Sequence, residues 1–177
     1  MEEGATGYLR EDGRTADADD EIAVRFATLQ ARLAAGLDRL RSPLLLACRL
    51  YVSWQFLKSG WLKLKDWDTT LFLFREEYHV PLLPPDWAAV AGAAGETMLP
   101  LLLIGGFASR PAALGLFAVN ALAVYSYRHV LLATGYEAAL AQHVLWGFML
   151  LVLIVFGAGR IAIDQAAIGS GAGRAIA

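Results

Sequence analysis

Cysteine and histidine are scarce in this 177-residue sequence, which contains one cysteine, Cys48, and three histidines. A single cysteine allows no disulfide within the chain and no metal site built from several thiolates. The sequence also lacks a nucleotide-binding glycine loop after a strand, a CxxC or HExxH motif and a serine nucleophile elbow. These absences exclude the soluble enzyme classes that depend on such motifs.

Charge is scarce as well. Only 18% of the residues are charged and 57% are hydrophobic, the mean hydropathy is +0.47 and the net charge is −2. This balance is typical of a membrane protein with several crossings and not of a soluble domain. The basic residues stand singly at the edges of apolar segments and form no stripe, so we expect no nucleic-acid partner.

The N-terminal region is polar and divides into two parts. Residues 1–21 hold eight of the 17 acidic side chains and only two basic ones, and residues 1–20 are predicted to be a disordered acidic tail. Residues 21–41 are predicted to form an amphipathic interfacial helix, which either lies on the membrane surface or binds a partner protein. Its apolar residues recur at spacings of three and four: Ile22, Phe26, Leu29, Leu33, Leu37 and Leu40.

The rest of the sequence predicts an all-α fold, an integral membrane four-helix bundle over residues 42–164. A short interfacial helix and a proline-rich strap are expected between the first two crossings, and residues 165–177 are expected to be a flexible tail. Each predicted crossing has roughly the 20 apolar residues that a bilayer requires. The crossings are predicted at about 42–64, 87–107, 111–130 and 138–161.

The distribution of basic residues predicts the orientation of these crossings. Loops on the cytoplasmic side of a membrane are enriched in lysine and arginine. The more basic side contains both chain ends, so we expect a multi-pass protein of the bacterial inner membrane with both termini cytoplasmic. That side has Arg25, Arg32, Arg39, Arg41, Arg110, Arg160 and Arg174, and the other side has Lys63, Lys65, Arg75 and Arg128.

The first crossing contains Arg49, Gln55 and Lys58, which a lipid-facing helix would not tolerate. A charge at membrane depth costs about 2.5 to 3.5 kcal/mol on insertion scales, so these residues should face a protein interior or a wet cavity. Glu96 lies near the middle of the second crossing. One interpretation is an ion pair of Glu96 with Lys58 or Arg49 that holds the helices together, and the other is a group that binds a ligand or handles a proton.

Two further polar residues lie in the later crossings. Asn120 is predicted at the depth of Glu96 and Gln55, and His143 nearer the depth of Lys58. His143 is either a hydrogen-bonded interior histidine or a ligand contact. A metal site could draw on Glu76, Glu77, His79, His129 and His143, but their spacing matches no metal-binding motif, so no metal site is predicted.

The stretches RLYVSWQFLKSGWLKL and GETMLPLLLIGGFASRPAALGL resemble the DoxX family of small four-helix bacterial membrane proteins. The resemblance covers about residues 42–164. It implies redox-associated membrane roles, because the related DoxD branch resembles the membrane subunit of a thiosulfate:quinone oxidoreductase. The positions that match the family pattern are Arg49, Gly60, Lys63, Glu96, Gly105 and Arg110.

These observations lead to one functional prediction with two alternatives. The protein is predicted to bind a quinone non-covalently and to act, at most, as a subunit or accessory of a periplasm-facing oxidoreductase or detoxification system. Glu96 and Lys58 are predicted to perform the chemistry, and the ligand contacts are predicted to be Arg49, Gln55, Lys63, Asn120, His143 and Trp146. The alternatives are a non-catalytic scaffold or biogenesis factor, and a small-molecule or metal transporter. A protein partner or a homo-oligomer is expected besides the lipid bilayer.

Overall fold

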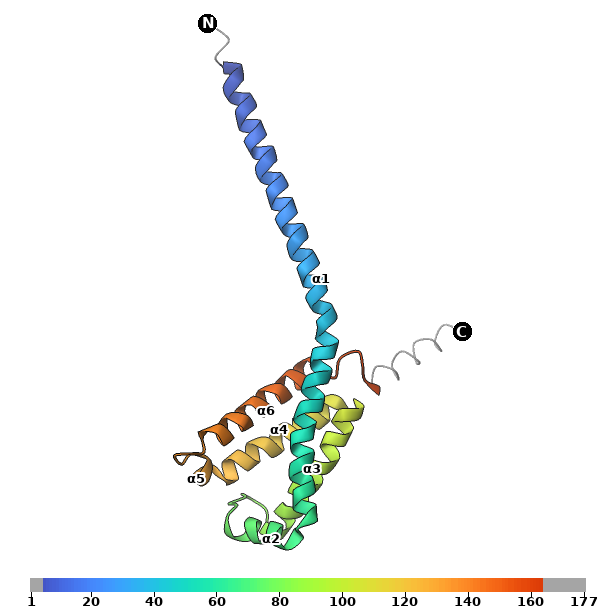
Figure 1. Cartoon of the computed structure of the whole chain (residues 1–177), viewed down its shortest axis with the longest axis vertical. Coiled ribbons are helices and arrows are strands. Elements are labelled where there is room, and N and C mark those ends of the chain that lie inside the picture. The colour runs from blue at the N-terminus through green and yellow to red at the C-terminus, as the bar shows by residue number, and fades with distance from the viewer. Residues whose placement is uncertain (1–4, 164–177) are drawn as a thin grey trace, which may run out of the picture. The chain divides into compact units, whose positions relative to one another are not determined.

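The computed structural model describes residues 5–163, and within this range it contains helices and no strand (Figure 1). The chain divides into two compact units, Met1–Arg41 and Ser42–Ala177. The all-α class predicted from the sequence is confirmed, and the predicted tail at 165–177 lies outside the described residues. The helices are α1 (Ala5–Lys65), α2 (Trp67–Glu76), α3 (Pro85–Gly105), α4 (Ser109–Ser126), α5 (Arg128–Leu131) and α6 (Glu137–Phe156).

The first unit consists of the N-terminal part of α1. The composition predicted a disordered tail over residues 1–20, whereas the structure has residues 5–20 in the helix. Extending an existing helix requires no new nucleus, so an adjoining polar stretch can continue it at low cost. The predicted amphipathic segment 21–41 is helical too, and the side chains of Phe26, Leu29, Leu33, Leu37 and Leu40 are exposed, from 54% at Leu29 to 67% at Leu37.

The sequence also predicted that a separate helix begins beside Pro43. In the structure Pro43 lies inside α1, which continues to Lys65. Proline removes one backbone donor from the helix, and here that loss does not end it. The second unit therefore starts within α1, and its part of this helix begins at Ser42.

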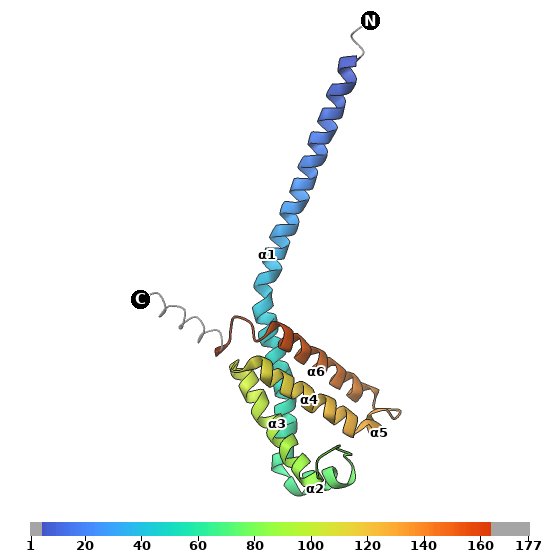
Figure 2. The same cartoon turned by 180° about the vertical axis from the view of Figure 1, so that it is seen from behind.

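One apolar core joins α1, α3, α4 and α6 of the second unit, and Figures 1 and 2 show the ribbons of these helices from two sides. Burial of these side chains is the main source of their attraction in water, and dispersion between close-packed groups contributes in any solvent. The core places α1, α3, α4 and α6 around a shared interior. Its members are Leu45, Val52 and Phe56 of α1, Leu103 of α3, Ala112, Ala113 and Leu116 of α4, and Leu150 and Leu153 of α6.

Helices α1 and α3 approach each other most closely at Gly60. A Cβ atom at Gly60 would lie 2.7 Å from Oγ1 of Thr97 and 2.9 Å from the carbonyl carbon and oxygen of Glu96. Glycine is required here because any side chain would overlap the α3 backbone. This contact brings the last turn of α1, with Lys63, beside the middle of α3.

The predicted short helix and proline-rich strap follow α1. Asp66 caps α2, since its carboxylate accepts hydrogen bonds from the backbone N–H of Thr69 at 3.1 Å and from the Thr69 hydroxyl at 2.8 Å. These hydrogen bonds lower the pKa of Asp66. Phe74 of α2 packs against Ala88 and Ala89 of α3, and residues 77–84 then run as an irregular strap to the start of α3.

Two described helices, Pro85–Gly105 and Glu137–Phe156, are long and apolar enough to cross a membrane. They cover most of the second and fourth predicted crossings. The third predicted crossing, 111–130, is divided between α4 and α5. The fourth ends at Phe156 and not at 161, because the chain leaves the helix at Gly157, whose φ of 75° is unfavourable for other residues.

Candidate functional site

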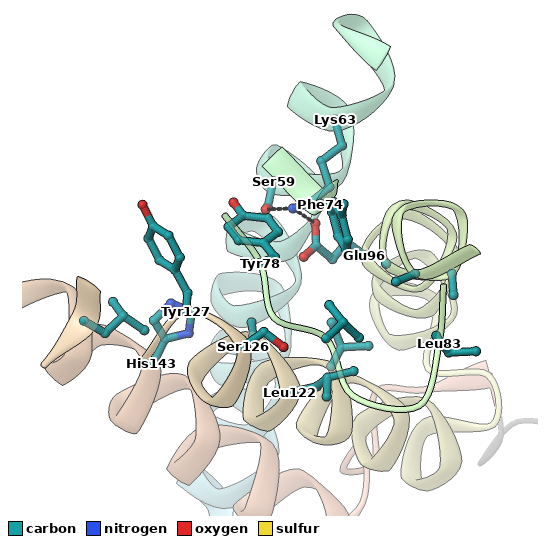
Figure 3. Close-up of a pocket in the computed structure, with 17 residues that line it drawn as sticks. Ser59, Lys63, Phe74, Tyr78, Leu83, Glu96, Leu122, Ser126, Tyr127 and His143 are labelled. Carbon is teal, nitrogen blue, oxygen red and sulfur yellow. Dashed lines mark hydrogen bonds and ion pairs between the residues drawn. The ribbon is translucent and has the colours of Figure 1, made fainter. Parts of the chain in front are cut away.

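A cavity of about 270 Å³ lies in the second unit, and residues of α1 to α6 and of the strap line it (Figure 3). Its size is near the lower limit for ligand pockets, which hold about 300 to 1,000 Å³. A compact ligand such as a single ring system therefore suits it. Its polar residues are Ser59, Lys63, Tyr78, Glu96, Ser126, Tyr127 and His143, and its larger apolar residues are Phe74, Val80, Leu83, Val119, Leu122 and Leu131.

An ion pair forms one polar end of this cavity. Lys63 Nζ lies 2.6 Å from Glu96 Oε2, and it also donates a hydrogen bond to Ser59 Oγ at 2.8 Å. The side chains of Lys63 and Glu96 are 17% and 9% exposed. An ammonium group has three N–H donors, and these two bonds use two of them. One N–H of Lys63 is therefore left for a bound molecule. The positive charge of Lys63 and the negative charge of Glu96 make the pair neutral as a whole.

Aromatic rings form the wall next to the ion pair. The ring of Tyr78, from the strap, packs edge-to-face on Phe74 at 4.9 Å and on Tyr127 at 5.1 Å between centroids. Burial raises the pKa of Tyr78, and the nearby Tyr127 and Glu96 raise it further. Its hydroxyl therefore stays protonated at neutral pH, and it can donate a hydrogen bond.

His143 lines the cavity from α6 and is held by Asn120 of α4. Asn120 Nδ2 donates to the backbone carbonyl of His143 at 2.9 Å, and Asn120 Oδ1 lies 2.9 Å from Nδ1 of the same histidine. Because the amide nitrogen is a donor, Oδ1 must accept, and Nδ1 must carry the hydrogen. In the neutral ring Nε2 is then an acceptor. The ring also packs edge-to-face on Trp146, 5.0 Å away.

Ser126, the last residue of α4, lines the cavity and is only 4% exposed. Its hydroxyl oxygen has no hydrogen-bond partner among residues 5–163. Its backbone carbonyl accepts a hydrogen bond of 3.2 Å from the N–H of His79 in the strap. The backbone of Ser126 is thus fixed, whereas its side chain is left with an unmet hydrogen-bonding capacity.

The structure brings together three of the residues predicted for the site. Lys63, Glu96 and His143 line the cavity. Asn120 and Trp146 do not line it, but both contact His143. These contacts make them positioning residues for His143.

The other predicted site residues lie elsewhere. Glu96 pairs with Lys63, where the sequence predicted Lys58 or Arg49, and Lys58 is exposed outside the cavity. Lys58 and Lys63 are five residues apart, about 140° around a helix, so they face different neighbours. Gln55 is half-buried and does not line the cavity.

Arg49 is buried and binds the segment that follows α6. Its Nη1 donates to the carbonyl of Ala158 at 3.1 Å, and its Nη2 donates to the carbonyl of Ile161 at 2.9 Å. These carbonyls have left the helix, so the guanidinium satisfies groups that would otherwise lack partners. The role of Arg49 in the structure is to anchor this segment.

Two histidines and a glutamate from the strap and α5 come close to one another without forming a metal site. The His79 and His129 rings are 5.1 Å apart, and His129 Nε2 lies 4.0 Å from Glu77 Oε2. Within the described part of the chain, no group of three or more His, Cys, Asp or Glu side chains could hold a metal ion.

Four polar residues of the cavity were not predicted: Ser59, Tyr78, Ser126 and Tyr127. Ser59 precedes Lys63 by one helical turn, a spacing that could have indicated their contact. Tyrosine near the end of an apolar segment is usually an interface anchor, so the two tyrosines carry no specific signal for a cavity. Ser126 carried a weak signal, a hydroxyl between two tyrosines at the end of a helix.

Comparison with known families gives one match, in which the DoxX family model covers residues 44–129. This range begins in α1 and includes the cavity residues except Leu131 and His143. No curated protein and no solved structure matches the chain.

Proposed function

The chain belongs to the DoxX family, which is membrane-associated, and from this premise we propose that it binds a quinone ring in its cavity and serves a redox-active partner. One observation carries the proposal. The neutral Lys63–Glu96 ion pair is the polar end of a small cavity whose other walls are largely aromatic and aliphatic. This combination favours a neutral, flat molecule with a hydrogen-bond acceptor at its edge.

The charges of the cavity support a neutral ligand. Lys63 and Glu96 compensate each other, so an anionic ligand would add an unbalanced charge at a site of low exposure. A quinone carbonyl oxygen needs only a donor, which the third N–H of Lys63 or the hydroxyl of Ser59 supplies. The rings of Phe74 and Tyr78 offer the apolar surface for its ring.

The same residues suit proton transfer to and from the bound ring. Lys63 stabilises the negative charge that develops on a carbonyl oxygen as the ring gains electrons. The Lys63 ammonium can give a proton to that oxygen when the ring is reduced, and the Glu96 carboxylate can accept one when the ring is oxidised. His143 Nε2 is a second acceptor in the cavity. The electrons come from a partner protein, so the chain is a subunit or accessory and its own contribution is binding and proton handling.

We place this cavity in a bacterial inner membrane, in a bundle of four crossings formed by α1, α3, α4 and α6. The lengths and apolar character of α3 and α6 support two of these crossings. The core that α1 and α4 share with them supports the other two. Reporter fusions at each terminus test the orientation, and activity of a periplasmic reporter at either end would contradict cytoplasmic termini.

The test of quinone binding is mass spectrometry of organic extracts from the gently purified protein, comparing the native chain with Glu96→Gln. We expect about one quinone per native chain and a loss of it in the variant. Asp86→Asn is the matched control, because Asp86 lies on α3 as Glu96 does but belongs to the exposed pair with Arg75 of α2. Equal quinone in all three proteins, or none in the native chain, would contradict the proposal.

The exposed apolar face of the first unit favours a second candidate, a non-catalytic scaffold or biogenesis factor that recruits a partner. Phe26, Leu29 and Leu33 are each more than half exposed. Leu29→Ser with Leu33→Ser in the full chain removes part of this face and leaves the cavity unchanged. Loss of cellular function in this variant, with Glu96→Gln fully functional, would favour the scaffold.

A further inference from the structure

Ser126 contradicts the general rule that buried hydroxyls are hydrogen-bonded. Ser126 is 4% exposed, and its Oγ has no partner within the described residues. Two other uncharged groups in this part of the chain share that condition, the Ser53 hydroxyl and Trp146 Nε1. Of the three residues, Ser126 alone lines the cavity. Its hydroxyl is therefore a hydrogen-bonding group that a molecule in the cavity can reach.

The fold holds this hydroxyl away from the ion pair. In Figure 3 Ser126 lies on α4, whereas the Lys63–Glu96 pair lies across the cavity, where α1 meets α3. The hydrogen bond from the His79 N–H to the Ser126 carbonyl ties the strap to this end of α4. The cavity therefore has hydrogen-bonding groups at two separate places, with apolar and aromatic walls between them.

We propose that the Ser126 hydroxyl is a second hydrogen-bond anchor for the ligand, and that the ligand is a para-quinone, a ring with carbonyl oxygens on opposite edges. Lys63 or Ser59 donates to one oxygen, and Ser126 donates to the other. A ring with one carbonyl would satisfy only the ion-pair end. This inference rests on the proposed quinone function and adds the arrangement of oxygens that the cavity selects.

The same observation gives Ser126 an unusual signature in mutagenesis. Removing a buried hydroxyl that lacks a partner also removes its desolvation cost, so Ser126→Ala should not lower the stability of the ligand-free protein. The ligand, however, loses one hydrogen bond. If Ser126 had only a structural role, Ser126→Ala would lower the stability of the ligand-free protein together with its affinity for the ligand.

The experiment measures binding of menadione, a para-quinone, and of alpha-tetralone, which has a similar fused ring frame and a single carbonyl. Each is titrated into the full-length protein in detergent, and thermal unfolding is recorded without ligand. The variants are Ser126→Ala and Ser126→Cys, which keeps the size and replaces a strong donor by a weak one. Ser53→Ala is the matched control, since Ser53 is also buried and unpartnered but lies outside the cavity.

We expect both Ser126 variants to bind menadione roughly three- to tenfold more weakly, the loss of one neutral hydrogen bond. Their affinity for alpha-tetralone should equal that of the native chain, and their melting temperatures should be unchanged or higher. Ser53→Ala should bind both compounds as the native chain does.

Three results would overturn the inference. Native affinity for menadione in both Ser126 variants would show that the hydroxyl contacts no ligand or only water. An equal loss in Ser53→Ala would show an effect of packing. An equal loss for alpha-tetralone would show that Ser126 does not recognise the second carbonyl. If menadione fails to bind the native chain, the proposed quinone function itself fails.

Discussion

The backbones of Gly60 and Glu96 are in contact, so that a Cβ atom at Gly60 would lie 2.9 Å from the carbonyl carbon of Glu96. This contact is what places Lys63, one turn further along α1, 2.6 Å from the Glu96 carboxylate. A glycine, which has no side chain, thus determines the geometry of the ion pair. The polar end of the cavity depends on helix packing as much as on its two charged residues.

Replacing Gly60 by alanine should therefore separate α1 from α3. We expect a loss of about 1 to 3 kcal/mol in the free energy of unfolding, the usual cost of overpacking, together with weaker quinone retention. Gly105→Ala is the control, because its Cβ would meet only Ile163 at 3.6 Å, an ordinary contact. Denaturant unfolding in mixed micelles measures the free energy of unfolding of both variants, and mass spectrometry of organic extracts measures the retained quinone. A neutral Gly60→Ala would mean that α1 and α3 adjust without cost.

The two charges of the ion pair should be strongly coupled. Lys63→Met or Glu96→Gln alone leaves one buried polar group without its partner, and each should cost roughly 3 kcal/mol of stability. The double variant removes both, so its cost should be smaller than the sum. A double-mutant cycle on the free energy of unfolding measures this coupling. Lys58→Met, at an exposed lysine of the same helix, should have little effect, and additive costs at Lys63 and Glu96 would contradict the pairing.

Asn120 should control the tautomer of His143. Asn120→Leu removes the acceptor of Nδ1 and the donor to the His143 carbonyl, so we expect a cost of about 1 to 3 kcal/mol in stability. Nitrogen NMR of the labelled imidazole should show hydrogen on Nδ1 in the native chain and a mixture of tautomers in the variant. An unchanged spectrum would show that another group holds His143.

Arg49 should matter more for stability than Arg110. Arg49→Gln removes charged donors from the carbonyls of Ala158 and Ile161, and hydrogen bonds from charged groups contribute about 1.5 to 3 kcal/mol each. Arg110 makes one exposed bond of 3.3 Å to the carbonyl of Val155, so Arg110→Gln is the matched control. Hydrogen exchange near Ala158 should accelerate in the first variant only. Equal acceleration in both would contradict the anchoring role of Arg49.

The start of α2 should loosen in acid. Hydrogen bonds from Thr69 lower the pKa of Asp66 in the folded chain, so the ionised cap stabilises α2 above the ordinary pKa of aspartate. That contribution is lost as the pH falls through the lowered pKa. The protection factor of the Thr69 amide against hydrogen exchange measures it. Asp66→Asn should remove the pH dependence, because asparagine caps without ionising.

Much of the architecture could be predicted because helices are local structures. Apolar runs and periodicity predicted the helical class, the short α2 and the proline-rich strap, and α3 and α6 begin within two residues of their predicted starts. The helix ends predicted from local signals differ from the structure at two places. Pro43 looked like a helix start, and it lies within α1. The fourth segment looked helical to 161, and Arg49 binds the carbonyls beyond Phe156 in a non-helical arrangement.

By itself, the sequence determined that charged and polar residues stand within apolar helices, and therefore that the interior of this protein is polar in places. Composition and spacing are sufficient for that conclusion, because a charge at membrane depth must find a partner. Only the tertiary structure decided that the partner of Glu96 is Lys63, that Lys58 faces outward, and that Ser126 reaches the cavity. The physical reason is that pairing depends on the rotation and register of one helix against another, which the close contact at Gly60 sets.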